Sequence, residues 1–463
     1  MCSLQRASVS AADCDCAWPK DRASLIDSAS IPWQNGFPFP GTLGDVRTVQ
    51  LIEMRQLTSA ASKRVKYEMT LEMTEDKNIE YEPGDSFYFI FPNPSDEIDY
   101  VLERLDLYTQ ANNRCVLSTV SDEKKVASAY LPSVASVRYW FTWCVDIRRT
   151  PGRPILRVLA EYTDCETERR RLLELCSSEG AAEFTSCVRK AALSLADILH
   201  AFPSCSPPVE RLLELLPRLQ PRPYSVACSP LISGRRLRFA YSLEKIPSGN
   251  GRFYDRLGLC TGWLTQRRPG DKISLILQEP KFFRLPSNAD ELCTTPLIMV
   301  GPGLGVCPFL GFLEHMKACG NNEQRSQRWL FFGCRNLSVD CVFKEELEGY
   351  LKSGVLSNLV ICESQPDDRN CSSSSTSGME ERKPIYVQDG LRLHSPAILS
   401  LLLRAGQSST RLYVCGDAHG MSKDVFQALV DIVIEHTGKP RLEAVNVLND
   451  LKRKNLYIED VWA

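Results

Sequence analysis

The stretch that decides the fold of the second half of the chain is PLIMVGPGLGVCPFLGFLEHMKA, residues 296–318. PLIMV is a short continuous apolar run, GPGLG is a glycine-rich turn, and FLGFLEHMKA continues as a helix. A buried strand that leads through a tight turn into a helix is typical of a parallel sheet covered on both faces. We therefore predict an α/β domain of the Rossmann-like type over residues 293–463.

Three later runs repeat this alternation of strand and helix. They are RWLFFGCR at 328–335, SNLVICES at 357–364 and TRLYVCGD at 410–417. Each run is followed by a helical or irregular segment, which supports the parallel sheet. Residues 366–382 are a Ser-rich, low-complexity stretch, and we interpret them as a flexible surface insertion.

The first half of the chain predicts an antiparallel β-barrel over residues 45–292. Strand-like runs occupy 46–54, 65–73 and 79–92, and they return at 221–230, 235–246 and 271–278. Apolar residues at helical spacing predict helices at 166–180, 188–202 and 208–219, inside a helical insertion at about 97–218. Residues 1–44 lack clear periodicity, and we expect a disordered leader there.

The composition excludes several classes of function. The net charge of −2 over 463 residues gives no general attraction to nucleic acid or to an anionic membrane. The N-terminus has no apolar signal segment, and the longest apolar stretch is interrupted by Gly and Pro, so we expect neither secretion nor membrane insertion. The 19 cysteines are scattered without the spacing of a zinc site, and we interpret them as reduced thiols of a cytoplasmic protein that holds no metal.

Two motifs have the residue types of a dinucleotide site. Gly301, Gly303 and Gly305 follow a strand and precede a helix, so their backbone N–H groups can approach a pyrophosphate. In RPYS at 222–225, an Arg suits a phosphate, a Tyr can stack on a flat ring and a Ser can bind polar ring atoms. The alternatives are a tight structural turn for the glycines and an ordinary edge strand for RPYS.

Two further motifs point to the same chemistry. LGLCTGWL at 257–264 has small residues that suit a second phosphate contact at a helix start, and a glycine-marked helix boundary is the alternative. LYVCGD at 412–417 ends a strand of the predicted parallel sheet, where ligands of α/β proteins bind. Cys415 and Asp417 therefore lie in the predicted site region, although a buried structural thiol is a competing interpretation of Cys415.

Taken in order, these motifs resemble the ferredoxin–NADP reductase-like half of the diflavin reductases over residues 45–463. The set consists of RPYS, GLCTGWL, GPGLGVCPF, FFGCR, YVQ, YVCGD and the terminal DVW. Within that family, FTWCVDIR at 141–148 and the ending LKRKNLYIEDVW at 451–462 are most similar to the branch whose partner is cobalamin-bearing methionine synthase. The resemblance implies FAD and NADPH as cofactors.

The resemblance also implies roles for individual residues. The residues that would bind FAD are Arg222, Pro223, Tyr224, Ser225, Gly258, Leu259, Cys260, Thr261 and Trp462. Those that would bind NADP are Lys66, Gly301, Gly303, Gly305, Ser364, Gln365, Tyr386, Val387, Gln388 and Asp424, with Lys383 nearby. Ser225, Cys415 and Asp460 would surround the reacting atoms of nicotinamide and flavin. Trp462 would stack on the flavin and move aside for nicotinamide; a hydrophobic anchor for the last strand is the alternative.

Four departures from the family pattern change these expectations, and one of them is the Ser-rich insertion, which separates Ser364 from Tyr386. Leu304 replaces the usual Thr of the glycine turn, and Gln365 stands where an Arg normally follows the Ser of the 2′-phosphate site. Because a neutral amide cannot form the charged, bidentate contact of Arg, we expect weaker discrimination between NADPH and NADH. The roughly 45 residues before the barrel hold no flavodoxin-like phosphate loop. We therefore expect FMN only if another chain or form supplies its domain.

The implied function is NADPH-dependent reduction of FAD, followed by electron transfer toward the reductive reactivation of cob(II)alamin-bound methionine synthase with S-adenosylmethionine. An FMN-less form that reduces only small acceptors is one alternative. A non-catalytic binding protein that keeps the fold is another, and a flavin-only oxidase is a third.

Overall fold

The computed structural model describes residues 2–5, 46–74, 80–119, 130–132, 134–278, 282–320, 326–366, 384–404 and 409–462. The chain divides into two compact units. The helical unit contains Met1–Val46, Phe89–Arg222 and Glu244–Gln266, and the two-sheet unit contains Arg47–Tyr88, Pro223–Leu243 and Arg267–Ala463. The two larger sheets of the protein belong mainly to the second of these units.

The first sheet of the two-sheet unit has six strands in the order β7-β4-β11-β2-β3-β8. Its strands are β2 Val46–Gln56, β3 Lys66–Met73, β4 Ser86–Ile90, β7 Arg222–Ser225, β8 Arg236–Ser242 and β11 Lys272–Gln278. β3 runs antiparallel to both β2 and β8. Buried residues alternate with partly exposed ones along much of β3, as expected when one face of a sheet packs on a core. The predicted antiparallel sheet is therefore confirmed.

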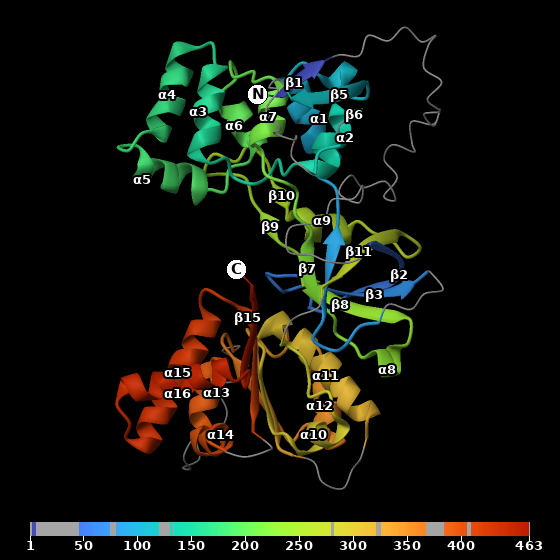
Figure 1. The fold of residues 1–463 in the computed structure, drawn as a ribbon, viewed down its shortest axis with the longest axis vertical. Helices are drawn as coiled ribbons and strands as arrows, with labels where there is room; N and C mark the ends of the chain where they lie inside the picture. The colour runs from blue at the N-terminus through green and yellow to red at the C-terminus, as the bar shows by residue number, and fades with distance from the viewer. Residues whose placement is uncertain are drawn as a thin grey trace. The chain divides into compact units, whose positions relative to one another are not determined.

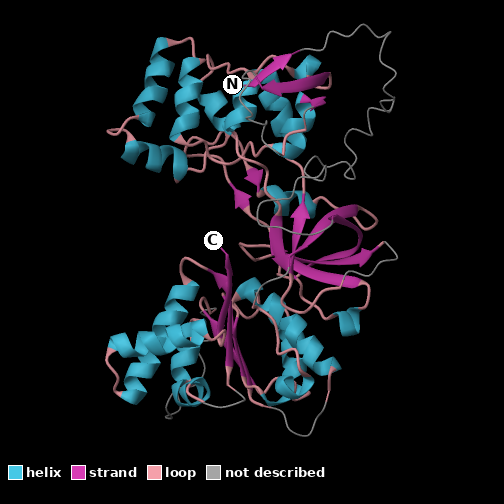
Figure 2. Ribbon diagram, viewed as in Figure 1, coloured by secondary structure: helices cyan, strands magenta, loops and turns pink. Residues whose placement is uncertain are grey.

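The second sheet has five parallel strands in the order β14-β13-β12-β15-β16. Its strands are β12 Leu297–Val300, β13 Arg328–Cys334, β14 Asn358–Glu363, β15 Arg411–Asp417 and β16 Tyr457–Trp462. All four residues of β12 are buried, because this central strand has a covered face on each side. Figure 2 shows both sheets in magenta.

Helices cover the parallel sheet on both faces (Figure 1). One apolar cluster joins Leu297 and Met299 to α10 Ala289–Thr294, α11 Cys307–Ala318 and α12 Lys344–Lys352. The other joins Ile298 and Val300 to α13 Val387–Leu393, α14 Ser395–Leu402, α15 Met421–Thr437 and α16 Arg441–Arg453. Alternate residues of one strand thus enter opposite cores, and the predicted α/β class is confirmed. A short helix, α8 Pro230–Ser233, precedes β8.

The helical unit contains short helices and two small sheets. Its helices are α1 Ser95–Arg104, α2 Val137–Tyr139, α3 Arg153–Glu161, α4 Glu166–Cys176, α5 Ala181–Glu183, α6 Leu195–Ala201, α7 Val209–Leu215 and α9 Leu259–Thr265. One small sheet has the order β1-β5-β6, with β1 Cys2–Gln5, β5 Arg114–Thr119 and β6 Val134–Ser136. The other pairs β9 Lys245–Ile246 with β10 Arg256–Leu257.

The helix predicted over 188–202 is wrong in its first half. A π-helical turn, Phe184–Arg189, occupies the start, and Ala192 adopts a left-handed φ of 53°. α6 then begins after Ser194, whose hydroxyl accepts the Asp197 N–H while the Asp197 carboxylate accepts the Ser194 N–H. This capping box starts a new helix, and apolar spacing alone did not reveal the interruption. β5 and β6 were not predicted either.

Two segments with sequence predictions fall largely outside the described residues. Of the predicted leader, the structure describes only β1, which runs antiparallel to β5. Of the predicted low-complexity insertion, it describes only Pro366.

Candidate cofactor-binding and hydride-transfer site

The glycine-rich turn lies between the end of β12 and the start of α11. The N–H of Gly301 donates to the Phe331 carbonyl at 3.0 Å, which ties the turn to β13. Gly303 has a φ of 59°, a left-handed conformation that favours glycine. A Cβ on Gly305 would overlap the Cys415 carbonyl oxygen, so the turn packs directly on the end of β15. The turn is therefore open at Gly303 and closely packed at Gly305.

The carboxyl ends of β15 and β16 bring predicted reactive residues together. Cys415 and Asp460 are register partners on these adjacent parallel strands. The Ser225 hydroxyl, from β7 of the other sheet, donates to Asp460 Oδ2 at 3.3 Å. The Ser86 hydroxyl donates in turn to Ser225 Oγ at 3.3 Å. The structure thus assembles Ser225, Cys415 and Asp460 from three strands at one sheet edge.

Burial controls the charge of these groups. It raises the pKa of Asp460, and the hydrogen bond from Ser225 opposes that rise because it favours the carboxylate. Burial also raises the pKa of Cys415 well above the usual thiol range, and the neighbouring Asp460 adds to the rise. The Cys415 side chain is fully buried in the apolar cluster of α10–α12, which favours a neutral thiol.

Trp462 ends β16 as the register partner of Asp417. Its carbonyl accepts the Ala418 N–H at 2.8 Å, so the backbone is held. Its side chain nevertheless remains 47% exposed, which is unusual for a large aromatic. The Asp417 carboxylate accepts the N–H groups of His419 and Gly420, which lowers its pKa. The terminal aromatic thus stands on a fixed strand with an accessible ring.

The RPYS motif forms β7. Arg222 donates to the Gln220 carbonyl at 2.7 Å, and its guanidinium lies 5.8 Å from the Phe91 ring centroid. Pro223 is exposed, and Tyr224 contacts the Tyr241 ring edge-on at 6.4 Å between centroids. Arg222 belongs to the helical unit, and the other three residues belong to the two-sheet unit.

The second predicted flavin segment lies in the helical unit, at the start of α9. Gly258 donates its N–H to the Glu244 carbonyl at 2.9 Å, and a Cβ there would meet Thr261 Oγ1 at 2.7 Å. The Thr261 hydroxyl accepts the Glu244 N–H at 3.4 Å. Leu259 is partly exposed, whereas Cys260 is buried. The predicted helix start is confirmed, and its cofactor role stays a prediction.

The predicted 2′-phosphate residues follow β14 and precede α13. Ser364 and the exposed Gln365 donate their N–H groups to the carbonyls of Cys334 and Arg335, at 3.1 and 2.6 Å. The Glu363 N–H donates to the Pro384 carbonyl at 3.2 Å, which joins this segment to the one that carries the predicted YVQ residues. The two segments therefore lie side by side despite the long insertion between them in sequence.

The YVQ residues lie at the start of α13, with Tyr386 just before it. Tyr386 precedes the helix and is 54% exposed, Val387 is buried, and Gln388 is partly exposed. The Tyr386 N–H donates to the Asp389 carboxylate at 3.0 Å, which fixes the helix start. Lys383 lies outside the described residues.

Lys66 and Asp424 occupy different surroundings. Lys66 is only 7% exposed, and its Nζ lies 3.4 Å from both the carbonyl and Oδ2 of Asp340. Its charge is thus already paired with an acid of the two-sheet unit. Asp424 is exposed on the first turn of α15.

Arg335 is a candidate that sequence reasoning did not single out. It follows β13 directly, and its N–H donates to Asp340 Oδ1 at 3.0 Å. Its carbonyl accepts the Gln365 N–H, so this cation lies next to the predicted 2′-phosphate segment. The quoted motif FFGCR contained the signal, because a cation directly after a buried parallel strand lies at the ligand-binding edge.

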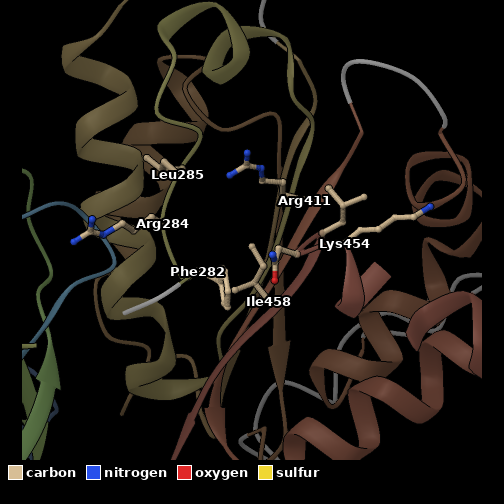
Figure 3. Close-up of a pocket in the computed structure, with 8 residues that line it drawn as sticks. Phe282, Arg284, Leu285, Arg411, Lys454 and Ile458 are labelled. Carbon is tan, nitrogen blue, oxygen red and sulfur yellow. The ribbon is translucent and has the colours of Figure 1, made fainter. Parts of the chain in front are cut away.

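A cavity of about 300 Å³ lies at the opposite edge of the parallel sheet (Figure 3). Its lining residues are Phe282, Arg284, Leu285, Arg411, Lys454, Asn455, Leu456 and Ile458. They include none of the predicted site residues. Arg411 is paired with Glu291 and Arg284 with Asp85, each at 2.7 Å, so both guanidinium charges are offset. Because α/β proteins bind ligands at the carboxyl ends of strands, this cavity is not the candidate site.

The described ranges hold neither a membrane-spanning helix nor a metal cluster. No helix there combines the length and apolar character needed to cross a bilayer. No group of three His, Cys, Asp or Glu side chains in those ranges is arranged to hold a metal ion.

Comparison with known proteins agrees with this geometry. The FAD binding domain family matches residues 42–263, and the oxidoreductase NAD-binding domain family matches residues 299–427. The chain is 41% identical over 455 residues to a methionine synthase reductase of Caenorhabditis elegans, which covers 95% of this chain and 63% of that protein. The human methionine synthase reductase is 37% identical, over 83% of this chain and 57% of that protein.

A more distant relative is an NADPH–cytochrome P450 reductase of Dictyostelium discoideum, 32% identical over 89% of this chain and 58% of that protein. The chain thus spans about 60% of the length of these relatives. The matches confirm the predicted resemblance, and the two family models support FAD and a nicotinamide dinucleotide as cofactors. The predicted domain boundaries and individual site residues stay predictions.

Proposed function

We propose that this chain, a homologue of the methionine synthase reductases, oxidises NADPH with a bound FAD and passes the electrons to an acceptor. The observation that carries the proposal is the hydrogen bond of Ser225 to Asp460 beside Cys415, at the sheet edge reached by the glycine turn. Bound NADPH would supply a hydride, and bound FAD would accept it and release electrons singly. The protein contributes position and electrostatics.

The residues of this edge fit a dinucleotide. Gly303 has open space where a side chain would stand, so a phosphate can approach its backbone closely. The exposed Trp462 offers a flat ring near the end of β16. Both features are accounted for by a ligand that carries a pyrophosphate at one end and a planar ring at the other.

On the nicotinamide side, we assign Ser225 and Asp460 to orienting the ring and to holding a proton near it. Asp460 suits this role because its burial favours the protonated form and Ser225 favours the ionised form. The neutral Cys415 thiol would pack behind the reacting atoms and limit their movement. Trp462 would cover the flavin when the nicotinamide subsite is empty and would move aside for the incoming ring.

On the adenosine side, we assign one group of residues to NADP through the predicted 2′-phosphate and nucleotide contacts. Its members are Lys66, Gly301, Gly303, Gly305, Ser364, Gln365, Tyr386, Val387, Gln388 and Asp424, with Arg335 added as a cation. Lys66 acts through Asp340, which it holds by an ion pair. The neutral Gln365 weakens selection for the 2′-phosphate.

We assign a second group of residues to FAD. Its members are Arg222, Pro223, Tyr224, Ser225, Gly258, Leu259, Cys260, Thr261 and Trp462. Arg222 would hold the pyrophosphate, because a guanidinium is suited to bidentate contact with phosphate oxygens. Tyr224 would stack on the isoalloxazine ring.

The proposed final acceptor is cobalamin on methionine synthase, in a reductive reactivation that also uses S-adenosylmethionine as methyl donor. The names of the relatives from worm and human support this partner. The proposed compartment is the cytoplasm, which agrees with the free thiols among the described cysteines. We further propose that small dyes or quinones can accept electrons from the same flavin.

One experiment tests the proposal. The purified chain is loaded with FAD, its visible spectrum is recorded, and NADPH is added without oxygen. We expect a yellow protein that bleaches, and reoxidation by methionine synthase that carries oxidised cobalamin. A chain that does not retain FAD would be a binding protein of another kind, and bound FAD that fails to bleach would exclude the nicotinamide reaction. Bleaching without transfer to methionine synthase would restrict the function to small acceptors.

A further inference from the structure

We propose that α1 and α6 position the predicted flavin-phosphate segment, Gly258–Thr261, through two buried ion pairs. The pairs are Arg148–Glu97 and Arg256–Asp197, and all of these residues lie in the helical unit. Each pair holds one of the two residues that directly precede the segment. This inference rests on the proposed function, since it assigns a task to the helices next to the FAD site.

The Arg256–Asp197 pair holds Arg256 in place. The Arg256 side chain is 3% exposed and that of Asp197 is 0% exposed, with Nη1 2.7 Å from Asp197 Oδ2. The same nitrogen donates to Ser194 Oγ at 3.0 Å, and Nη2 donates to the Ala192 carbonyl at 2.8 Å. The guanidinium therefore has partners on several sides and allows Arg256 little freedom of position.

Asp197 is fixed independently of Arg256. Its Oδ2 accepts the N–H and the hydroxyl of Ser194 at 2.7 and 2.8 Å, in the capping box that starts α6. Its Oδ1 accepts the Phe253 N–H at 3.4 Å. The Asp197 carboxylate thus fixes Arg256 and the residues near it relative to the N-terminal end of α6.

The Arg148–Glu97 pair holds Leu257 in place. Arg148 donates through Nη1 to the Leu257 carbonyl, while its Nε lies 2.7 Å from Glu97 Oε2 on α1. The Arg148 and Glu97 side chains are only 11% and 4% exposed. Because the same guanidinium contacts a helix carboxylate and a backbone carbonyl, α1 sets the position of Leu257.

Neither ion pair occupies the segment itself. Gly258 and Thr261 are held instead by Glu244, through the hydrogen bonds to its backbone. The segment is therefore fixed at its entrance by the two ion pairs and at its side by Glu244. The segment as a whole is therefore held in a set position before phosphate binds, so less ordering remains to be done on binding. This arrangement makes Glu97, Arg148, Asp197 and Arg256 positioning residues.

The test measures FAD affinity and flavin reduction separately in the full chain. Apoprotein is titrated with FAD for wild type, Glu97→Gln, Asp197→Asn and Arg256→Lys. Removing one charge of a buried pair leaves the other uncompensated, so we expect the FAD Kd to rise about tenfold or more in the two neutral variants. Arg256→Lys keeps the charge but loses the planar fork, and we expect a smaller rise.

The second readout is the rate of flavin reduction by NADPH at saturating FAD. A positioning role predicts that this rate stays within about twofold of wild type, because the reacting groups are elsewhere. Asp99→Asn is the matched control: Asp99 also lies on α1 and pairs with Arg138 at 2.5 Å, but this pair does not touch residues 256–261. We expect its FAD Kd to be unchanged.

Three results would overturn the inference. The first is an FAD Kd that is unchanged in both Glu97→Gln and Arg256→Lys. These two variants are sufficient for the test if Asp197→Asn does not fold. The second is an equal rise in Asp99→Asn, which would indicate general destabilisation. If wild type binds FAD and is reduced by NADPH, either result overturns the inference alone. The third is a wild type that does not bind FAD, which overturns the proposed function as well.

Discussion

The Ser225 hydroxyl lies 3.3 Å from Oδ2 of Asp460, although 235 residues separate the two in sequence. The contact joins the antiparallel sheet to the last strand of the parallel sheet within the two-sheet unit. It places a hydroxyl beside a carboxyl group whose pKa is raised by burial, at the edge where the glycine turn ends.

Ser225→Ala and Asp460→Asn should slow the reduction of bound flavin by NADPH. Small losses of alignment between reacting groups lower rates by about 100-fold in favourable cases, and we expect a decrease of about tenfold to 100-fold here. Stopped-flow absorbance at saturating NADPH measures it. Ser422→Ala is the control, since the Ser422 hydroxyl donates to Glu459, the neighbour of Asp460 on β16. Equal rates of flavin reduction in all three variants would show that Ser225 and Asp460 have no part in the hydride-transfer step.

The raised pKa of Asp460 predicts a pH dependence of stability. The folded protein keeps this proton to higher pH than the unfolded chain does, because burial raises the folded-state pKa. Stability from this group is therefore present below the ordinary carboxyl pKa of about 4 and is lost as pH rises through the raised value. Asp460→Asn should gain stability relative to wild type as pH rises above about 4. Urea unfolding across this range measures the difference, and a pH-independent difference would contradict the prediction.

Gln365→Arg should increase the preference for NADPH over NADH. A hydrogen bond to a charged group contributes about 1.5–3 kcal/mol, so the ratio of kcat/KM values should rise about tenfold or more. Gln365 is exposed, so a longer side chain has room at this position. Its backbone is held by Arg335 and Asn336, so the segment should keep its position in the variant. Gln365→Glu should lower the same ratio. If wild type strongly prefers NADPH and Gln365→Arg leaves the ratio unaltered, the neutral amide does not weaken discrimination.

Trp462→Ala should shift the cofactor preference toward NADH and slow the release of NADP. In the proposed site the indole of Trp462, which is exposed, would compete with nicotinamide for the flavin face, and stacking of this kind contributes about 0.5–1.5 kcal/mol. We expect a change of about twofold to tenfold in the ratio of kcat/KM values. Leu442→Ala removes another exposed apolar side chain, 73% exposed on α16, and should leave the ratio as it is. An unchanged ratio in Trp462→Ala would leave only an anchoring role for the last strand.

Gly305→Ala should destabilise the two-sheet unit far more than Gly303→Ala. A Cβ at 305 would overlap the Cys415 carbonyl, whereas no atom lies within 4 Å of a Cβ at 303. Gly303→Ala then retains only the strain of a left-handed backbone, about 1 kcal/mol. Gly305→Ala forces two backbone segments apart, which we expect to cost about 3 kcal/mol. Urea unfolding of the apoproteins measures both, and equal losses would show that β15 can move.

Local patterns predicted the elements well where the physical cause is local. The continuous apolar run of β12 and the turn after it were predicted from a few neighbouring residues, and β13, β14 and β15 followed in the same way. The helix predicted over 188–202 failed because Ser194 and Asp197 form a capping box that starts α6. Apolar spacing continues across that interruption, so periodicity alone could not detect it.

The amino-acid sequence by itself determined the class of the two larger sheets and the glycine turn, because these depend on residue spacing over short distances. The order of the motifs along the chain determined the family resemblance. Only the tertiary structure decided that Lys66 is paired with Asp340, 274 residues away, and that Ser225 meets Asp460. It also decided that Arg256 is fixed by Asp197 of α6. Contacts of this kind depend on which distant segments the two cores bring together, and no local pattern records that choice.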